Sequence, residues 1–152
     1  ALTKIGNYRT LIDHVTVTMA EAIRTNSPLS LAIFDIDEFK KINDSKGHIS
    51  GDLVLAEIAQ ILKKSIRSGD FVGRYGGEEF MVIFPDTDLP SAIQESEKIR
   101  QAVENYSFVE GIKLTISGGI KQFEGENLTD FIRFADKHLY EAKANGKNKI
   151  AP

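Results

Sequence analysis

A pair of adjacent glycines between two apolar runs is the feature that most restricts the fold of this chain. The runs, residues 71–74 and 79–84, are rich in the aromatic and branched side chains that favour strands, and Gly76 and Gly77 lie between them. Adjacent glycines tolerate positive φ angles, so a tight turn is predicted to join the two runs as antiparallel strands. The fold must therefore contain a sheet with a hairpin over residues 71–84.

Helical and extended patterns alternate on both sides of this hairpin. Helices are expected mainly where apolar side chains recur every three or four residues. They cover residues 7–26, 37–45, 52–66, 92–106 and 128–144. Further strands are expected at 29–36 and 114–120, with a last edge strand at 149–150. Strands interleaved with helices, together with one hairpin, predict an α/β sandwich with a mixed sheet.

Length, charge and composition limit the partners of the chain. It has 152 residues, which fits one domain, and a formal net charge of −3. No nucleic acid polymer and no membrane surface is expected as a partner, and a polyanionic substrate would need local cations or a metal. The absence of cysteine excludes disulfides and thiolate sites and fits a cytoplasmic location. No apolar run approaches the ~20 residues that span a bilayer.

Acidic side chains stand at two unusual places in the sequence. Asp35 and Asp37 end an apolar run, and Glu78 and Glu79 follow the two glycines. If strand 29–36 lies beside the hairpin, Asp35 and Glu78 converge at one end of the sheet. Paired carboxylates with one or two Mg²⁺ ions recur in enzymes that transfer phosphoryl or nucleotidyl groups. The competing interpretation is an ordinary glycine hairpin with a solvated or capping aspartate, because short motifs are only hypotheses.

Several separated motifs in a fixed order resemble the GGDEF family of diguanylate cyclases. Gly76-Gly77-Glu78-Glu79-Phe80 is similar to the family signature in its Glu variant. The other matching segments are residues 2–3, 7–9, 34–40, 42–44, 47–48, 51–52, 117–119, 135–136, 139–140, 142–143 and 146–148. Residues 4–6 and Tyr8 depart from the opening motif, which puts the docking of the first helix in doubt.

The resemblance implies a fold and a domain organisation. The fold is α/β (α+β), a ferredoxin-like nucleotidyl-cyclase sandwich with a central mixed five-stranded sheet, flanking helices and a β-hairpin that carries the signature. Residues 1–152 would form one GGDEF catalytic domain, excised from a longer chain with an N-terminal sensor or dimerisation region.

The resemblance also implies a reaction, in which two GTP molecules condense to cyclic di-GMP with release of two pyrophosphates. The reaction would depend on Mg²⁺ or Mn²⁺ and occur where two domains face each other in a homodimer. Asp35 and Glu78 would bind the metal together with the Ile36 carbonyl. Glu79 would help to activate the GTP 3′-hydroxyl.

Residues that hold the substrate follow from the same resemblance. Asn43 and Asp52 would recognise guanine, since a carboxylate can accept both N1–H and N2–H. The triphosphate and the approach of the nucleotide would depend on Glu38, Phe39, Gly76, Gly77, Lys143 and Lys147. The competing interpretations are helix capping for Asn43 and Asp52, and a basic last helical turn for the two lysines.

A second ligand site is implied by Arg67-Ser68-Gly69-Asp70, which matches the RxxD inhibitory motif of the family. Arg67 and Asp70 would bind cyclic di-GMP and give feedback inhibition, with Lys98 contacting a phosphate. The competing interpretation is a solvated surface ion pair, worth about 0–1 kcal/mol.

Three other functions compete with the active cyclase. A catalytically silent domain would bind GTP or cyclic di-GMP as a regulatory module, but Asp35, Asn43, Asp52, Glu78 and Glu79 are all present. A cyclase that forms a mixed GMP–AMP ring is disfavoured by Asp52. A purely structural domain would have no need for this combination of motifs.

Overall fold

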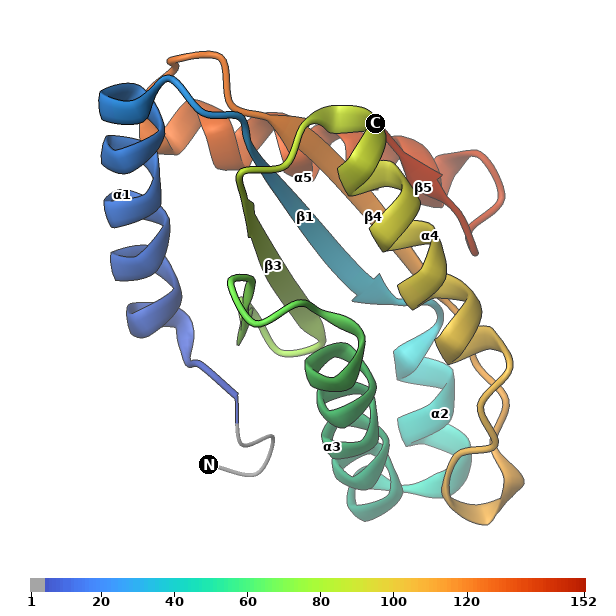
Figure 1. Cartoon of the computed structure of the whole chain (residues 1–152). Coiled ribbons are helices and arrows are strands. Elements are labelled where there is room, and N and C mark those ends of the chain that lie inside the picture. The colour runs from blue at the N-terminus through green and yellow to red at the C-terminus, as the bar shows by residue number, and fades with distance from the viewer. Residues whose placement is uncertain (1–4) are drawn as a thin grey trace.

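The computed structural model describes residues 5–152, which form a five-stranded sheet in the order β2-β3-β1-β4-β5 (Figure 1). The strands are β1 (Leu29–Ile36), β2 (Phe71–Arg74), β3 (Glu79–Pro85), β4 (Ile116–Gln122) and β5 (Ile150–Ala151). β1 pairs antiparallel with β3 and β4, β2 pairs antiparallel with β3, and β5 pairs parallel with β4. The predicted mixed five-stranded sheet is therefore confirmed, and the hairpin β2–β3 forms one of its edges.

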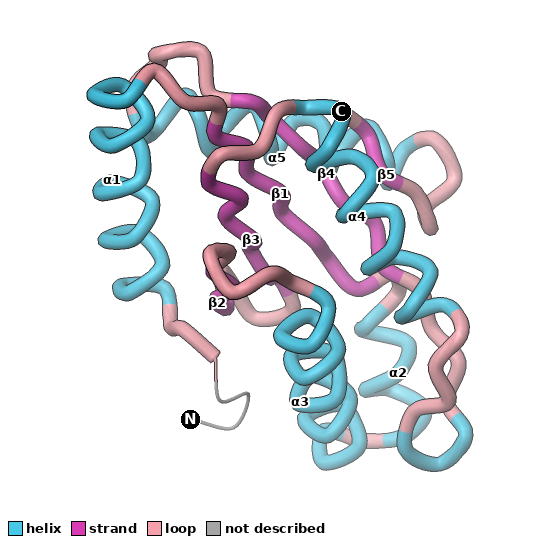
Figure 2. Tube along the Cα trace, viewed as in Figure 1, coloured by secondary structure: helices cyan, strands magenta, loops and turns pink. Residues whose placement is uncertain are grey.

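Helices cover both faces of this sheet (Figure 2). They are α1 (Tyr8–Thr25), α2 (Phe39–Lys46), α3 (His48–Ser65), α4 (Leu89–Glu104) and α5 (Leu128–Ala144), with a short 3₁₀ helix η1 (Val109–Gly111). Ala32 and Phe34 of β1 pack with α3 and α4, whereas Leu31 and Ile33 pack with α1 and α5. This alternation follows from the two-residue period of a strand and gives the sandwich two apolar layers. No helix within residues 5–152 has both the length and the apolar character needed to cross a membrane.

Gly6, which precedes α1, is docked against the outer edge of β2. Gly6 donates to the Val72 carbonyl at 3.3 Å, and its own carbonyl accepts from Arg74 at 2.7 Å. A side chain at residue 6 would collide with Phe71 at 2.8 Å, so glycine permits this close approach. Gly6, which departs from the family's opening motif, thus still allows α1 to dock. Residues 2–4 of that motif lie outside the described residues.

Several predicted boundaries are wrong by a few residues, and one of the errors bears on the site. α3 begins at His48, one turn before the predicted start, because Gly47 ends α2 and also caps α3 with a φ of 89°. Asp52 therefore lies inside the helix and does not cap it. The strand predicted from residue 114 begins at Ile116.

The turn between β2 and β3 also differs from its predicted form. Gly76 and Gly77 are not among the described glycines with positive φ, so conformational freedom is not what the turn requires. A Cβ on Gly76 would instead lie 2.8 Å from a carboxylate oxygen of Glu79. Tyr75 and Gly76 both donate backbone hydrogen bonds to the Glu79 carbonyl, at 2.8 and 3.2 Å. The turn thus folds tightly over the first residue of β3.

Candidate active site

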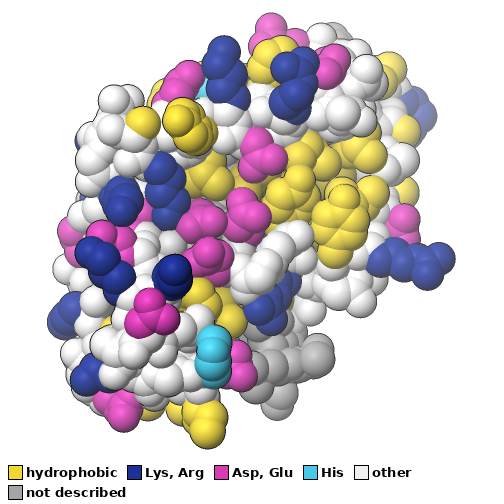
Figure 3. Space-filling model, turned by 180° about the vertical axis from the view of Figure 1, so that it is seen from behind, with side chains coloured by type: hydrophobic (Ala, Val, Ile, Leu, Met, Phe, Trp, Pro, Cys, Tyr) yellow, Lys and Arg dark blue, Asp and Glu magenta, His cyan; other side chains and the backbone are white. Residues whose placement is uncertain are grey.

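The pairing of β1 with β3 brings the acidic residues together at one end of the sheet. Asp35 lies opposite Glu79 in the antiparallel register, and the Ile36 amide donates to the Glu78 carbonyl at 3.4 Å. Asp35 and Glu78 therefore converge, as expected from the sequence. In Figure 3, acidic side chains gather near the middle of one face, with Lys and Arg side chains beside them. The site is a half-buried acidic edge of the sheet.

Lys143 reaches this edge from the last turn of α5. Its ammonium lies 2.8 Å from a carboxylate oxygen of Asp35 and 2.8 Å from one of Asp37. It also donates to the carbonyl oxygens of Ile36, at 3.2 Å, and of Asp35, at 3.5 Å. The side chain thus contacts two acidic residues, which the interpretation as a basic last helical turn does not require.

Asp37 is buried at the centre of a hydrogen-bond network that the sequence did not reveal. Its carboxylate accepts from Thr115 Oγ1 at 2.7 Å, Ser117 Oγ at 2.8 Å and the Asn148 amide at 2.9 Å, in addition to Lys143. Burial alone would raise the pKa of Asp37, but these donors outweigh burial and lower it. Asp37 thus stays ionised and joins β1, β4 and the segment after α5.

The other carboxylates of the edge have the opposite electrostatic balance. Burial raises the pKa of Asp35, and the hydrogen bond and charge of Lys143 offset it only in part. Burial, followed by the negative charge of Asp35, raises the pKa of Glu78 and of Glu79. For Glu79, Asp136 on α5 adds further repulsion. The edge therefore holds more negative charge than its own cation neutralises.

The residues expected to recognise guanine lie together where α2 meets α3. Asn43 is on α2, and its amide oxygen is buried without a hydrogen-bond partner within the described residues. This oxygen lies so close to Gly51 of α3 that a Cβ on residue 51 would sit 1.9 Å from it. Asp52 is the next residue and is exposed. Neither side chain caps a helix, so the capping interpretation is wrong for both.

The expected triphosphate residues surround the start of α2. Glu38 precedes this helix with a φ of 56°, and no side chain caps the helix, which begins at Phe39. Uncapped amides at a helix N-terminus favour anionic groups. Lys147 lies 3.4 Å from the Glu38 carboxylate, so it reaches the same place from beyond α5. Lys143 and Lys147 thus lie on the acidic edge and on its border with α2.

Arg67 and Asp70 form a separate site just before β2. The Asp70 carboxylate accepts from the Arg67 amide at 3.0 Å and from the guanidinium at 3.3 and 3.4 Å. The Asp70 side chain is 2% exposed and that of Arg67 is 54% exposed, so one face of the guanidinium stays open to solvent. Lys98 pairs with Glu95 at 3.5 Å. The structure describes no contact of Lys98 with Arg67 or Asp70.

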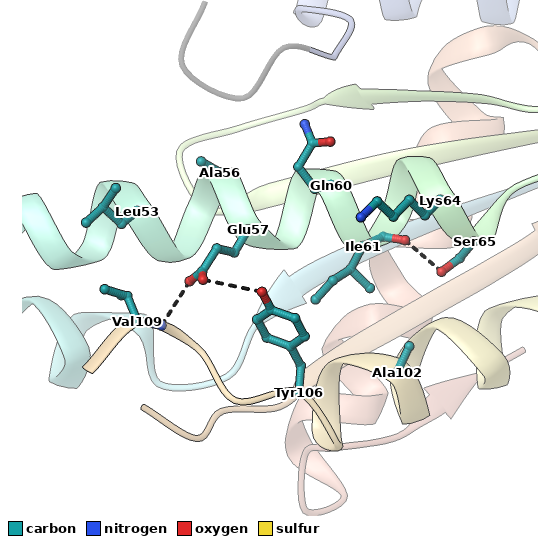
Figure 4. Close-up of a pocket in the computed structure, with 10 residues that line it drawn as sticks. All are labelled: Leu53, Ala56, Glu57, Gln60, Ile61, Lys64, Ser65, Ala102, Tyr106 and Val109. Carbon is teal, nitrogen blue, oxygen red and sulfur yellow. Dashed lines mark hydrogen bonds between the residues drawn. The ribbon is translucent and has the colours of Figure 1, made fainter. Parts of the chain in front are cut away.

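An apolar groove of 590 Å³ lies away from these charged sites, between α3 and the segment after α4 (Figure 4). Glu57 ties its two walls together, because its carboxylate accepts from the Val109 amide at 3.1 Å and from the Tyr106 hydroxyl at 3.4 Å. None of the residues predicted to act in catalysis or binding lines this groove. This groove therefore does not mark the predicted site, whereas a second groove of 640 Å³ has Asp37 and Glu38 among its lining residues.

Sequence reasoning missed three residues that support the site. No role is predicted for Asp37, although it stands in the same short segment as Asp35. Asn148 was noted only within a motif, and Asp136 was noted in the same way. A carboxylate in a predominantly apolar region was the one available signal, since hydrogen bonds over more than a hundred residues cannot be inferred from spacing.

The mixed sheet, the acidic strand ends and the lysines that approach them define a class of domain suited to nucleotidyl transfer. Residues 1–149 match the family model described as "Diguanylate cyclase, GGDEF domain". The chain belongs to this family, whose members are nucleotidyl cyclases.

Curated relatives and solved structures agree with this assignment. The chain is 40% identical over 145 residues, 92% of its length, to "Diguanylate cyclase A" of Treponema denticola. It is 40% identical over 156 residues, covering 98% of its length, to "Response regulator PleD" of Caulobacter vibrioides. It spans only 39% and 34% of the lengths of these two relatives.

Two solved structures show the same fold. One is the active GGEEF domain of a diguanylate cyclase from Vibrio cholerae, with a TM-score of 0.93, 34% identity and 97% coverage of each chain. The other is the GGDEF domain of DgcB from Caulobacter crescentus in complex with c-di-GMP. It has a TM-score of 0.94 and 31% identity, and the match covers 99% of this chain and 90% of that one.

Proposed function

We propose that this domain condenses two GTP molecules into cyclic di-GMP and releases two pyrophosphates. The observation that carries the proposal is the convergence of Asp35, Glu78 and Glu79 at the ends of β1 and β3, in a chain of the GGDEF family. Three carboxylates with raised pKa values beside one lysine form an edge that favours additional positive charge. A Mg²⁺ ion fits this requirement, and it can contact substrate phosphates at the same time.

The residues of the edge fit a hard divalent cation. Asp35 and Glu78 offer carboxylate oxygens, Ile36 offers a carbonyl, and the Lys143 ammonium already contacts oxygens of Asp35 and Ile36. Within residues 5–152 no group of three or more acidic or histidine side chains forms a complete metal site. Mg²⁺ suits such a partial set, because it keeps water and shares substrate phosphates. When bound, the metal would neutralise charge on the phosphates and on the leaving pyrophosphate.

The residues of the chain would divide the remaining work. Asn43 and Asp52 would orient guanine, and the unpartnered Asn43 oxygen supports this role because a buried acceptor without a donor is costly. The amides at the start of α2, with Lys143 and Lys147, would hold the triphosphate. Glu79, whose pKa is raised, would accept the proton of the 3′-hydroxyl, since a base works best with a pKa nearer the working pH.

One such edge holds one GTP, so ring closure needs two domains. We propose that the 3′-hydroxyl of each GTP attacks the α-phosphorus of the GTP held by the facing domain in a homodimer. We further propose that residues 1–152 act as one catalytic domain in the cytoplasm, under a regulatory or dimerisation region elsewhere in the protein. Arg67 and Asp70 would bind the product at a distance from the acidic edge.

Product analysis tests this function. Concentrated protein is incubated with GTP and Mg²⁺, and the nucleotides are identified by chromatography and mass spectrometry. We expect cyclic di-GMP, with a specific rate that rises steeply with protein concentration because the active species is a dimer. No product, even from domains fused to an enforced dimer, would contradict the proposal and favour a nucleotide-binding regulatory module.

A further inference from the structure

Lys143 contacts the acidic edge as a bound cation would. Four oxygen atoms from three consecutive residues surround its ammonium: the carboxylates of Asp35 and Asp37, each at 2.8 Å, and the carbonyls of Ile36 and Asp35, at 3.2 and 3.5 Å. Two of these residues, Asp35 and Ile36, are those proposed to bind the metal. Asp37 is not among them. The ammonium therefore bridges the proposed metal ligands and a carboxylate that lies beside them.

We propose that Lys143 is a built-in cation that exchanges with the divalent metal at Asp35 and Ile36, while Asp37 holds the lysine beside the site throughout. This inference rests on the proposed function, because it takes the metal ligands from it. Asp37 acts here as a positioning residue, since it acts through Lys143.

The contacts of Asp37 explain why it can serve as the fixed anchor. Three of its four donors, on Thr115, Ser117 and Asn148, are independent of Lys143. Its side chain is 5% exposed, and these three donors bind both of its carboxylate oxygens. If Lys143 leaves Asp35, the Asp37 carboxylate still attracts it, so the lysine stays within reach of the site.

Asn148 fixes the other side of this anchor. It ends a run of three residues with positive φ, namely Gly146 at 115°, Lys147 at 63° and Asn148 at 49°. Its side chain accepts from Arg100 of α4 at 2.7 Å and donates to Glu104 at 2.6 Å. The unusual backbone of this segment is thus held at Asn148 from two directions. The segment also carries Lys147, so the same hydrogen-bond network positions both Lys143 and Lys147.

Electrostatics makes the exchange competitive. Two cations cannot occupy the same carboxylate oxygens without strong repulsion, because the interaction of unit charges at contact distance is large away from bulk water. Metal binding must therefore displace Lys143 from Asp35. The oxygen atoms of a triphosphate offer the displaced ammonium new partners, so nucleotide favours the exchange. The consequence is that the domain binds metal weakly until GTP arrives.

Titration with Mn²⁺ in the absence of nucleotide tests the exchange without any measurement of turnover. Free Mn²⁺ is followed by electron paramagnetic resonance for the wild type, Lys143→Met and Lys147→Met. Lys147→Met is the matched control, because it removes the same charge as Lys143→Met. The Lys147 ammonium contacts Glu38 at 3.4 Å instead of Asp35. We expect Lys143→Met to bind Mn²⁺ about tenfold more tightly or better. Lys147→Met should stay within about threefold of the wild type, since a more distant charge is screened.

Each outcome distinguishes this inference from the proposed function. Equal tightening by both variants would reflect net charge alone and would overturn the exchange, while the metal site would stand. No binding by the wild type or by either variant would contradict the metal site itself. Circular dichroism confirms the fold of each variant, and Lys143→Gln, which keeps a hydrogen-bond donor without the charge, replaces Lys143→Met if that protein is unfolded.

The anchor has its own measurement. The Asn148 amide donates to the Asp37 carboxylate in the wild type. In ¹H–¹⁵N spectra, Asp37→Asn should therefore shift the resonance of this amide and those of its neighbours up to Ala151. Asp13→Asn, an exposed change on α1 with the same loss of charge, should leave them in place. Unchanged resonances in Asp37→Asn would overturn the role of Asp37 as anchor.

Discussion

The two charged sites at the hairpin β2–β3 treat their carboxylates in opposite ways. Before β2, Asp70 is nearly fully buried, and three donors of Arg67 satisfy its two oxygens. At the start of β3, Glu78 and Glu79 share a single lysine with Asp35 and Asp37, and burial and repulsion raise the pKa of three of these four groups. A matched pair needs no ligand to be stable, whereas an edge with excess negative charge is stabilised by any cation that binds there. The contrast separates a preformed ion pair, which we propose to bind the product, from an edge that we propose to bind a metal and the substrate.

The largest expected effect is a loss of activity at the acidic edge, where negative charge exceeds positive charge. Asp35→Asn removes a proposed metal ligand and a partner of Lys143 while keeping the shape of the side chain. We expect the rate of cyclic di-GMP formation to fall on the order of a thousand-fold, because metal stabilisation of the phosphates contributes several kcal/mol. Steady-state rates at saturating GTP and Mg²⁺ measure this loss. Asp13→Asn is the matched control and should retain the wild-type rate, so a similar loss in both would contradict the assignment.

Guanine recognition gives the next largest effect. Asp52→Ala removes the acceptor proposed for N1–H and N2–H, and we expect KM for GTP to rise at least about tenfold with a smaller change in kcat. Competition between GTP and ATP measures selectivity, which should fall in parallel. Since Asp52 is exposed and caps no helix, stability should be unchanged. A rise in KM with unaltered selectivity would contradict base recognition by this residue.

Substitution in the Arg67–Asp70 pair should change feedback inhibition rather than the rate of turnover. We expect Arg67→Ala to weaken inhibition by cyclic di-GMP about tenfold or more, because the flat guanidinium is lost. The initial rate without product should stay within about twofold, since Arg67 lies outside the acidic edge. The free energy of unfolding should fall by about 1 kcal/mol, because buried Asp70 keeps only one donor.

Arg133→Ala is the control for Arg67→Ala. Arg133 pairs with Asp130 at 2.9 Å in the same i,i+3 spacing, but both side chains are largely exposed. Exposed pairs contribute little, so neither inhibition nor stability should change measurably. Equal inhibition of the wild type and Arg67→Ala would remove the product site from the account.

The smallest expected effect is on the pH dependence of stability, which has opposite signs for Glu79 and Asp37. Glu79 has a raised folded pKa, so its favourable contribution is full below the unfolded value of 4.5 and is lost as the pH rises through the folded pKa. Glu79→Gln should therefore gain stability relative to the wild type as the pH rises above 4.5. Asp37 has a lowered pKa, so Asp37→Asn should cost stability that disappears as the pH falls below 3.8. Urea unfolding at a series of pH values measures both, and pH-independent differences would contradict both assignments.

The sequence predicted the secondary structure well where local signals were strong. Asn7 and Asn26 mark the two ends of α1, in agreement with the predicted range. Asn7 accepts from the Thr10 amide, and Asn26 adopts the left-handed conformation that ends a helix. The convergence of Asp35 and Glu78 also followed from a simple rule of strand pairing. The start of α3 was missed because Gly47 both ends one helix and begins the next, without a side-chain cap.

Long-range contacts set the limit of sequence reasoning at the site. The bond from Lys143 to Asp37 spans 106 residues and that from the Asn148 amide spans 111, and no periodicity reports such distances. Gly76 is likewise predicted to supply a positive φ to the turn, whereas its φ is not positive and close contact with Glu79 excludes a side chain there. The chemistry of each residue was visible in the sequence, but its partners were fixed by tertiary packing.

The most direct test of the acidic edge compares activity and stability in one variant, Glu79→Gln, which keeps the size of the side chain and removes its charge. Cyclic di-GMP formed from GTP and Mg²⁺ is quantified by mass spectrometry, and unfolding of the same protein is measured at neutral pH. The account predicts product formation slowed at least about a hundred-fold, together with a free energy of unfolding equal to or above that of the wild type. A variant that forms cyclic di-GMP at close to the wild-type rate would contradict it.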